Sequence, residues 1–272
     1  MKSSSDGKND IPLSRRTYNK FVANEMMEDF ALRYTSKRAR KWSYSRIAIT
    51  ALGIVSFMVL EAIGGAITVS YGFTNAAWAI FALILVIFIS GLPISYYAAR
   101  YGVDVDLLSR GAGFGYLGST ITSLVYASFT FIFFALEAAI MAMALLLWLD
   151  IPLSFGYAIS ALIVIPLVSH GITNISRFQV WSQPFWIVLQ LIPLLYVFNH
   201  PDSNFQNWFS FKGDLEGEGG EFNILLFGAA SAILFSLVAQ IGEQVDFLRF
   251  LPITTDGAKP INWWLAVIFA GP

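Results

Sequence analysis

The chain has 272 residues, of which 56% are hydrophobic and only 13% are charged, and its formal net charge is −1. Soluble chains average about 45–50% apolar and about 25% charged residues, so this composition excludes an ordinary water-soluble domain and a mostly disordered chain. The near-zero net charge argues against a nucleic-acid partner recognised through basic patches. The absence of cysteine excludes thiolate catalysis and Cys-based metal sites. We therefore predict an all-α integral membrane protein whose environment is the lipid bilayer.

Apolar stretches of membrane-spanning length recur along the chain. A helix needs about 20 mostly apolar residues to cross the hydrocarbon core. Residues 1–45 form a polar segment, and we assign 46–272 to a transmembrane domain. Its predicted spans are 47–70, 74–98, 119–149, 152–169, 180–198, 222–241 and an incomplete seventh at 261–272. Because the seventh stretch has only about half of the needed length, we expect the sequence to be a fragment of a longer protein.

The distribution of basic residues predicts the orientation of these spans. With this division, all 17 Lys and Arg residues except Lys212 fall on the side of the N-terminal segment. Cytoplasmic loops carry the excess of positive charge in membrane proteins. We therefore expect a multi-pass protein of the bacterial inner membrane with a cytoplasmic N-terminus. The loop between the fifth and sixth spans is acidic and falls on the outer side, with Asp202, Asp214, Glu216, Glu218 and Glu221.

Two carboxyl side chains fall inside predicted spans. Glu61 lies just past the middle of the first span, and Glu137 lies near the middle of the third. A charge at the centre of a membrane helix costs on the order of 2.5–3.5 kcal/mol on insertion scales, so each needs a reason. One interpretation is structural: the carboxyl group hydrogen-bonds a neighbouring helix. The other is functional: the group binds a solute or carries a proton in a polar cavity.

The first and sixth spans have features of helices that are interrupted within the membrane. The first contains Gly53, Gly64 and Gly65 beside its charged residue. These glycines are also explained by close helix packing. The sixth changes abruptly from apolar to polar at Gln240, and either leaves the membrane there or breaks at Gly242. Interrupted helices supply backbone groups to ligands in many transporters.

A possible recognition face lies on the third span. Phe133 and Glu137 are four residues apart and so share one face of a helix. An aromatic ring beside a hydrogen-bonding group suits a flat heterocycle, which stacks on the ring and bonds through its edge.

Signals for enzymatic chemistry are weak. The run GAGFG at 111–115 follows a membrane span instead of a strand, and so does not match a dinucleotide-binding motif. The two histidines, His170 and His200, lie at different span ends. We identify no catalytic residues, no metal site and no resident cofactor, and we expect the protein not to be an enzyme.

Two stretches resemble a known family. GVDVDLLSRGAGFGYLGS at 102–119 is similar to the loop that precedes the third helix of cytosine and purine permeases, and VDFLRF at 245–250 is similar to the end of their sixth helix. The chain thus looks like the N-terminal half of a nucleobase–cation symporter. The resemblance implies a leucine-transporter-like fold of two inverted five-helix repeats followed by two further helices. The solute and the cation would then bind beside the broken first and sixth helices, in a chain truncated after the start of the seventh.

The resemblance also suggests roles for individual residues. Phe133 stands where the family has a stacking Trp, and Glu137 stands where it has a Gln that bonds the base edge. A carboxylate in place of that Gln favours a cationic or amidine-like ligand. Ser56, Glu61 and Gln240 would add contacts from the two interrupted helices. Backbone carbonyl groups near Gly53 and Ser56 would form part of a cation site, with Na⁺ or H⁺ as the coupling ion.

These observations lead to two functional hypotheses. The first is a secondary active permease for a nucleobase-like or related small nitrogenous solute, coupled to a cation or to protons. The alternative is a permease-like sensor, whose membrane unit detects a ligand and controls a fused C-terminal signalling domain such as a histidine kinase. A small-molecule solute is the expected partner in both.

Overall fold

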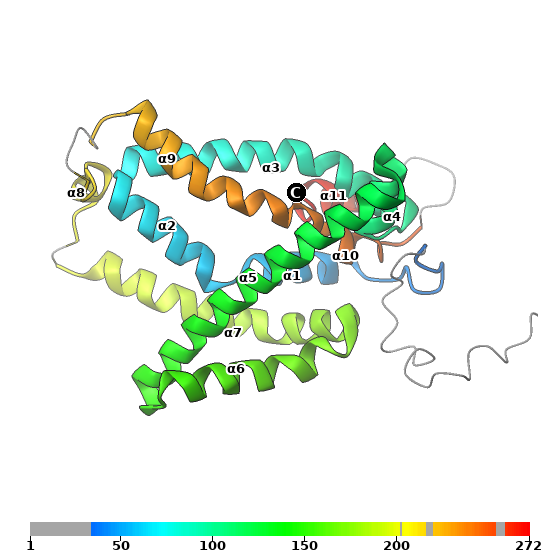
Figure 1. Ribbon diagram of the computed structural model, residues 1–272, viewed down its shortest axis with the longest axis horizontal. Helices are drawn as coiled ribbons and strands as arrows, with labels where there is room; N and C mark the ends of the chain where they lie inside the picture. The colour runs from blue at the N-terminus through cyan, green and yellow to red at the C-terminus, as the bar shows by residue number, and fades with distance from the viewer. Residues whose placement is uncertain (1–33, 202, 216–219, 254–258) are drawn as a thin grey trace, which may run out of the picture.

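The computed structural model describes residues 34–201, 203–215, 220–253 and 259–272, and every regular element in them is a helix (Figure 1). Residues 1–33 of the polar N-terminal segment and the acidic residues Asp202, Glu216 and Glu218 lie outside the described part. The helices run mostly along the long axis of the molecule, with α5 crossing the others obliquely. The described chain therefore has the all-helical class that its composition predicts.

The first predicted span consists of two helices. Helix α1 (Tyr44–Val55) begins after Ser43, whose hydroxyl accepts a hydrogen bond from the backbone N–H of Arg46 and so caps the helix. Helix α2 (Met58–Tyr71) follows after two residues, and the two helix axes are bent by 49°. The interruption that the sequence predicted for this span is present.

A short turn joins α2 to α3 (Phe73–Tyr101). Gly72 adopts a φ of 81°, a conformation that only glycine takes up readily, and its N–H closes α2 by donating to the carbonyl of Thr68. Helix α3 packs along α9 (Ile224–Leu234), where Ala76 and Ala79 of α3 and Ala230 of α9 are fully buried. Small residues at these positions let the two helices approach closely.

The sixth span changes its helical type along its length. Helix α9 passes into a 3₁₀ segment, η3 (Phe235–Gly242), and then into α10 (Gln244–Leu248). The irregularity therefore starts well before Gly242 and ends there. The described geometry is a tightened helix without a sharp bend, because 224–248 still qualify as one continuous span.

Between α3 and the long helix α5 lies a compact helical connection. It comprises α4 (Val105–Ser109) and a π-helical turn, η2 (Arg110–Phe114), ahead of α5 (Gly115–Leu149). Helix α5 then packs against α6 (Leu153–Val168), followed by α7 (Gly171–Asn199) and the short α8 (Phe205–Phe209).

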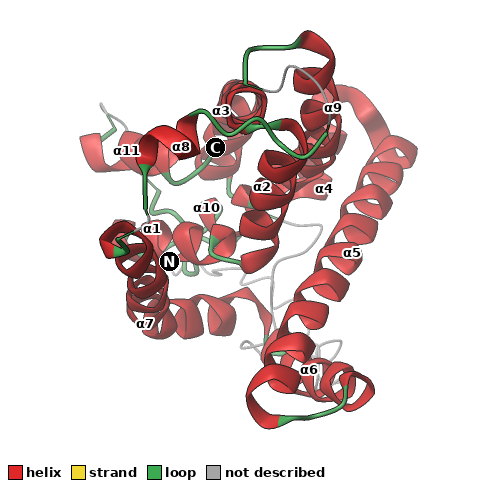
Figure 2. Ribbon diagram, turned by 90° about the vertical axis from the view of Figure 1, so that its left-hand side faces the viewer, coloured by secondary structure: helices red, strands yellow, loops and turns green. Residues whose placement is uncertain are grey.

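A buried cluster holds the last helix, α11 (Ile261–Phe269), against the ends of several others. Trp263 and Val267 of α11 are buried with Ile47 of α1 and with residues of α10 and its end, namely Val245, Leu248 and Leu251. Figure 2 shows α1 and α7 on one side of the molecule and α5 on the other, with α2 between them.

Four helical stretches in the described residues are long and apolar enough to cross a membrane, and the bent α1–α2 pair counts as a fifth. The four cover 73–101, 105–149, 171–199 and 224–248. These features support an integral membrane protein.

Several helices differ in length from the predicted spans. Helix α7 begins at Gly171, well before the predicted start at 180. Its first turns are polar, so the apolar run from which the span was predicted begins later than the helix itself. Helix α6 has 16 residues, about 24 Å at 1.5 Å per residue, and is thus shorter than the hydrocarbon core. Helix α11 has nine residues.

Hydrogen bonds hold two groups of helix ends together, one at each end of the molecule. At one end, Arg46 of α1 donates to Ser176 Oγ (2.9 Å) and to the carbonyl of Thr173 (3.0 Å) of α7. At the opposite end, the segment after α8 lies on the turn between α2 and α3, where Phe73 N–H donates to the carbonyl of Phe211 at 3.0 Å. The side of the membrane that each group faces stays a prediction.

Candidate functional site: a broken helix beside an apolar cavity

The interruption between α1 and α2 is formed by Ser56 and Phe57. Ser56 has φ −88° and ψ 73°, and Phe57 is extended, with φ −143° and ψ 145°. Such a break leaves the first N–H groups of α2 and the last carbonyl groups of α1 without partners in their own helices. Inside a membrane these groups need partners from elsewhere in the protein. Neither residue is Gly or Pro, so the partners described below stabilise the break.

Glu137 of α5 supplies one of these partners. Its Oε1 accepts a hydrogen bond from the backbone N–H of Val59 at 2.9 Å, across 78 positions of sequence. The carboxyl group therefore occupies the N-terminal end of α2, where the helix dipole favours a negative charge. Glu137 is half-buried at this position. The structural interpretation of Glu137, a bond to a neighbouring helix, is present in the molecule.

Gln183 of α7 supplies a second partner and was not among the residues predicted from the sequence. Its Nε2 donates to Ser56 Oγ at 2.8 Å, and the Ser56 hydroxyl donates to the carbonyl of Leu52 in the preceding turn. The Gln183 side chain is only 4% exposed. In the sequence, Gln183 is distinguished only as a polar residue directly before Pro184 in an apolar span. No local pattern indicates that it contacts Ser56.

Phe133 also reaches the break. Its ring meets the ring of Phe57 edge to face at 5.8 Å and lies 4.3 Å from the ring of Phe129. Phe133 thus contacts Phe57 of the break, and Glu137 contacts Val59 in the first turn of α2. Both do so from one face of α5, as their spacing predicted. Phe133 also lines a cavity of about 520 Å³ between α5 and η3, together with Ile63, Leu136 and Ser236.

Gly53 lies where α1 and α7 come closest. A Cβ atom at this position would be 2.8 Å from Gln179 Cγ of α7, too close for an ordinary contact. Gly53 therefore serves the close-packing role that was the alternative explanation of the glycines. The proposed cation contact through its carbonyl stays a prediction.

Glu61 and Gln240 lie apart from the residues at the break. Glu61 is in the first turn of α2 and its side chain is exposed. Gln240 belongs to η3, and its Nε2 donates to Glu243 Oε2 at 3.2 Å. The structure thus brings together Ser56, Phe133 and Glu137, and places Glu61 and Gln240 elsewhere.

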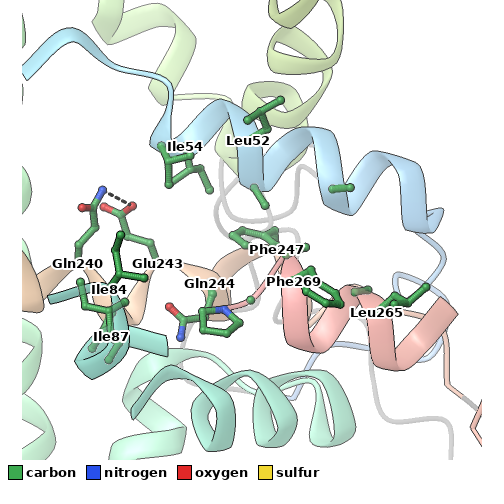
Figure 3. Close-up of a pocket in the computed structure, with 18 of the residues that line it drawn as sticks. Leu52, Ile54, Ile84, Ile87, Gln240, Glu243, Gln244, Phe247, Leu265 and Phe269 are labelled. Carbon is green, nitrogen blue, oxygen red and sulfur yellow. Dashed lines mark hydrogen bonds between the residues drawn. The ribbon is translucent and has the colours of Figure 1, made fainter. Parts of the chain in front are cut away.

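The cavity that Gln240 lines is the larger of the two, at about 920 Å³, between α1, α3, η3, α10 and α11. Val55 and Leu60, which flank the break, form part of its wall. Figure 3 shows Gln240 and Glu243 side by side, with Ile54 on one side of the pair and Ile84 and Ile87 on the other. Its volume is within the range of small-molecule sites, about 300–1,000 Å³.

The described residues contain no group of three or more His, Asp or Glu side chains placed to hold a metal ion. No protein-family model, curated protein or solved structure matches the chain. The helices and the site define a helical protein that has apolar helices of membrane-spanning length and an interrupted span beside a cavity.

Proposed function

We propose that the protein is a secondary active permease for a nucleobase-like or related small nitrogenous solute. The observation that supports this most is the break at Ser56–Phe57. Side chains of two other helices stabilise it, and its neighbours Val55 and Leu60 line a cavity of about 920 Å³. Irregular backbone persists in a membrane only where protein or a cavity satisfies it. Maintaining such a break beside a cavity of solute size is typical of transporters.

The arrangement of the two irregular spans adds support. Helices α1 and α2 on one side and η3 and α10 on the other both contribute to the cavity wall. The leucine-transporter-like fold places an interrupted first span and an irregular sixth span beside one cavity. We propose that arrangement for this chain, with the 3₁₀ segment η3 as the irregular part of the sixth span. In this proposal a sodium ion or a proton drives transport, the N-terminus is cytoplasmic, and no bond of the solute is made or broken.

Uptake by the full-length protein in proteoliposomes tests the proposal. We expect at least one labelled nucleobase or small amine to accumulate when a sodium or proton gradient is imposed, and to stop accumulating when the gradient is collapsed. Glu137→Ala should reduce uptake by about tenfold or more, since a displaced α2 N-terminus alters the cavity wall. Asp150→Asn, which removes a carboxyl group at the distant C-terminal end of α5, is the matched control.

Two results would contradict the permease. If folded protein accumulates no solute of the panel under either gradient, transport is wrong. If the same protein binds a solute with high affinity but moves none, the sensor hypothesis is favoured.

A further inference from the structure

The larger cavity is mostly apolar, and its polar lining residues outside η3 and α10 are Tyr44, Ser45 and Asn262. Its polar residues near the break are Gln240, Glu243 and Gln244, all from η3 and α10. Gln244 is buried, and its Nε2 lies 3.4 Å from the carbonyl of Gly91 in α3. The remaining wall is largely aliphatic and aromatic, including Leu52, Val55, Leu60, Ile84, Ile87 and Phe269.

The free hydrogen-bonding groups of this wall are mostly acceptors. The Gln240 amide donates one N–H to Glu243 Oε2, which leaves its second N–H as a donor and the Gln240 carbonyl oxygen and the second oxygen of Glu243 as acceptors. Among the described residues, neither of these oxygens receives a hydrogen bond from another side chain. A ligand that supplies donors can therefore bond both oxygens.

The charge of this wall is one-sided as well. No Arg, Lys or His occurs among the described residues that line the cavity. The next carboxyl group along the helix, Asp246, pairs with Arg249 at 3.5 Å, so that this cation is already engaged one turn away from Glu243. A carboxylate surrounded by apolar groups is costly without a counter-ion. The missing positive charge is one that a ligand can bring.

We propose that the cavity binds an amphipathic organic cation, in which an ammonium group is attached to an aliphatic or aromatic body. The ammonium donates to Glu243 and to the carbonyl oxygen of Gln240, and the body lies against Leu60, Ile84 and Ile87. This inference rests on the proposed function, because it names the class of solute for that site. In this inference the positive charge of the solute is recognised by Glu243 and not by Glu137, whose carboxyl group accepts a hydrogen bond from Val59 N–H.

Binding of 2-phenylethylamine, an ammonium ion at pH 7, and of its neutral analogue 2-phenylethanol tests this directly. The full-length protein in lipid nanodiscs is titrated with each compound by calorimetry. We expect saturable binding of the amine and at least about tenfold weaker binding of the alcohol, because a charge-assisted hydrogen bond is lost. Glu243→Gln should weaken amine binding by a similar factor and leave alcohol binding unchanged.

Two further variants make the test specific. Ile84→Trp fills the cavity from α3 without altering its charge and should abolish binding of the amine. Asp150→Asn removes one carboxyl group far from the cavity and should bind the amine like the wild type. Monodispersity and the melting temperature of each variant show that it is folded.

The outcomes separate this inference from the proposed function. Equal binding of amine and alcohol, no binding of the amine to wild-type protein, or unchanged amine affinity in folded Glu243→Gln would overturn the organic-cation site. Gradient-driven uptake of a neutral nucleobase combined with any of these results would retain the permease and reject this ligand class. Amine binding that depends on Glu243 without any uptake would retain the site and reject the permease.

Discussion

The carboxyl group of Glu137 lies 2.9 Å from the backbone nitrogen of Val59, so that a side chain of α5 caps the first turn of α2. The contact joins two spans that are separated in the sequence by α3, α4 and η2. It gives the intramembrane carboxyl group a structural role at the point where the first span is interrupted. Any movement of α5 relative to α1 would therefore act on the break.

Replacement of Glu137 should separate its hydrogen-bonding role from its charge. Glu137→Gln keeps an acceptor for the Val59 N–H and should change stability little. Glu137→Ala leaves that N–H unpaired and should destabilise the protein by about 1–3 kcal/mol. Thermal unfolding in detergent measures the difference. Equal melting temperatures for the Ala variant and the wild type would show that Glu137 does not stabilise the break.

Two glycines of the first span should respond oppositely to alanine. Gly53→Ala introduces a Cβ 2.8 Å from Gln179 Cγ and should cost about 1–3 kcal/mol through overpacking of α1 against α7. Gly64→Ala in α2 meets no atom within 4 Å and gains helix propensity, so it should be neutral or stabilising by up to about 1 kcal/mol. Thermal melting of both variants in the same detergent makes the comparison. A Gly53→Ala variant as stable as Gly64→Ala would contradict the close contact.

Substitution of Arg40 should destabilise the fold, whereas substitution of an exposed basic neighbour should not. Its guanidinium is buried and donates to the carbonyl groups of Ala99, Arg100 and Leu251, which ties the segment before α1 to the ends of α3 and α10. Burial lowers the pKa of this guanidinium. Arg40→Lys cannot reproduce the planar set of donors and should destabilise the fold by about 1–3 kcal/mol.

The exposed Arg38 offers the matched control for this substitution. Arg38→Lys should melt like the wild type, and limited proteolysis should cut the N-terminal segment faster only in Arg40→Lys. Indistinguishable melting and proteolysis of the two variants would show that Arg40 does not tie this segment to α3.

Local features of the sequence predicted the elements better than their contacts. The apolar lengths located α3, α5 and the sixth span, because a membrane helix has to be continuously apolar. The interruption of the first span was predicted from Glu61 and its glycines, yet it falls at Ser56–Phe57, where long-range partners decide the backbone. Spacing alone placed Phe133 and Glu137 on one face of α5.

The partners of these residues could not be predicted from local patterns. Gln183 bonds Ser56 across 127 positions, and the relative placement of α1 and α7 decides that contact. Glu243 was not singled out, because it follows Gln240 at the polar end of the sixth span, and the cavity around it depends on how α3 and α11 pack there. Residues whose role depends on the packing of distant helices are those that the sequence left unassigned.

A secondary active permease has to open the cavity beside the Ser56–Phe57 break to each side of the membrane in turn. These 272 residues contain no cysteine, so a cysteine in place of Leu60, on the cavity wall beside the break, is the only thiol among them; cysteines elsewhere in the full-length protein are replaced first. Its modification by a membrane-impermeant thiol reagent is measured in right-side-out and inside-out vesicles. A cysteine in place of the fully buried Ala142 serves as the control. We predict modification of the Leu60 position from both sides, whereas modification from neither side, at the rate of the Ala142 control, would contradict the account.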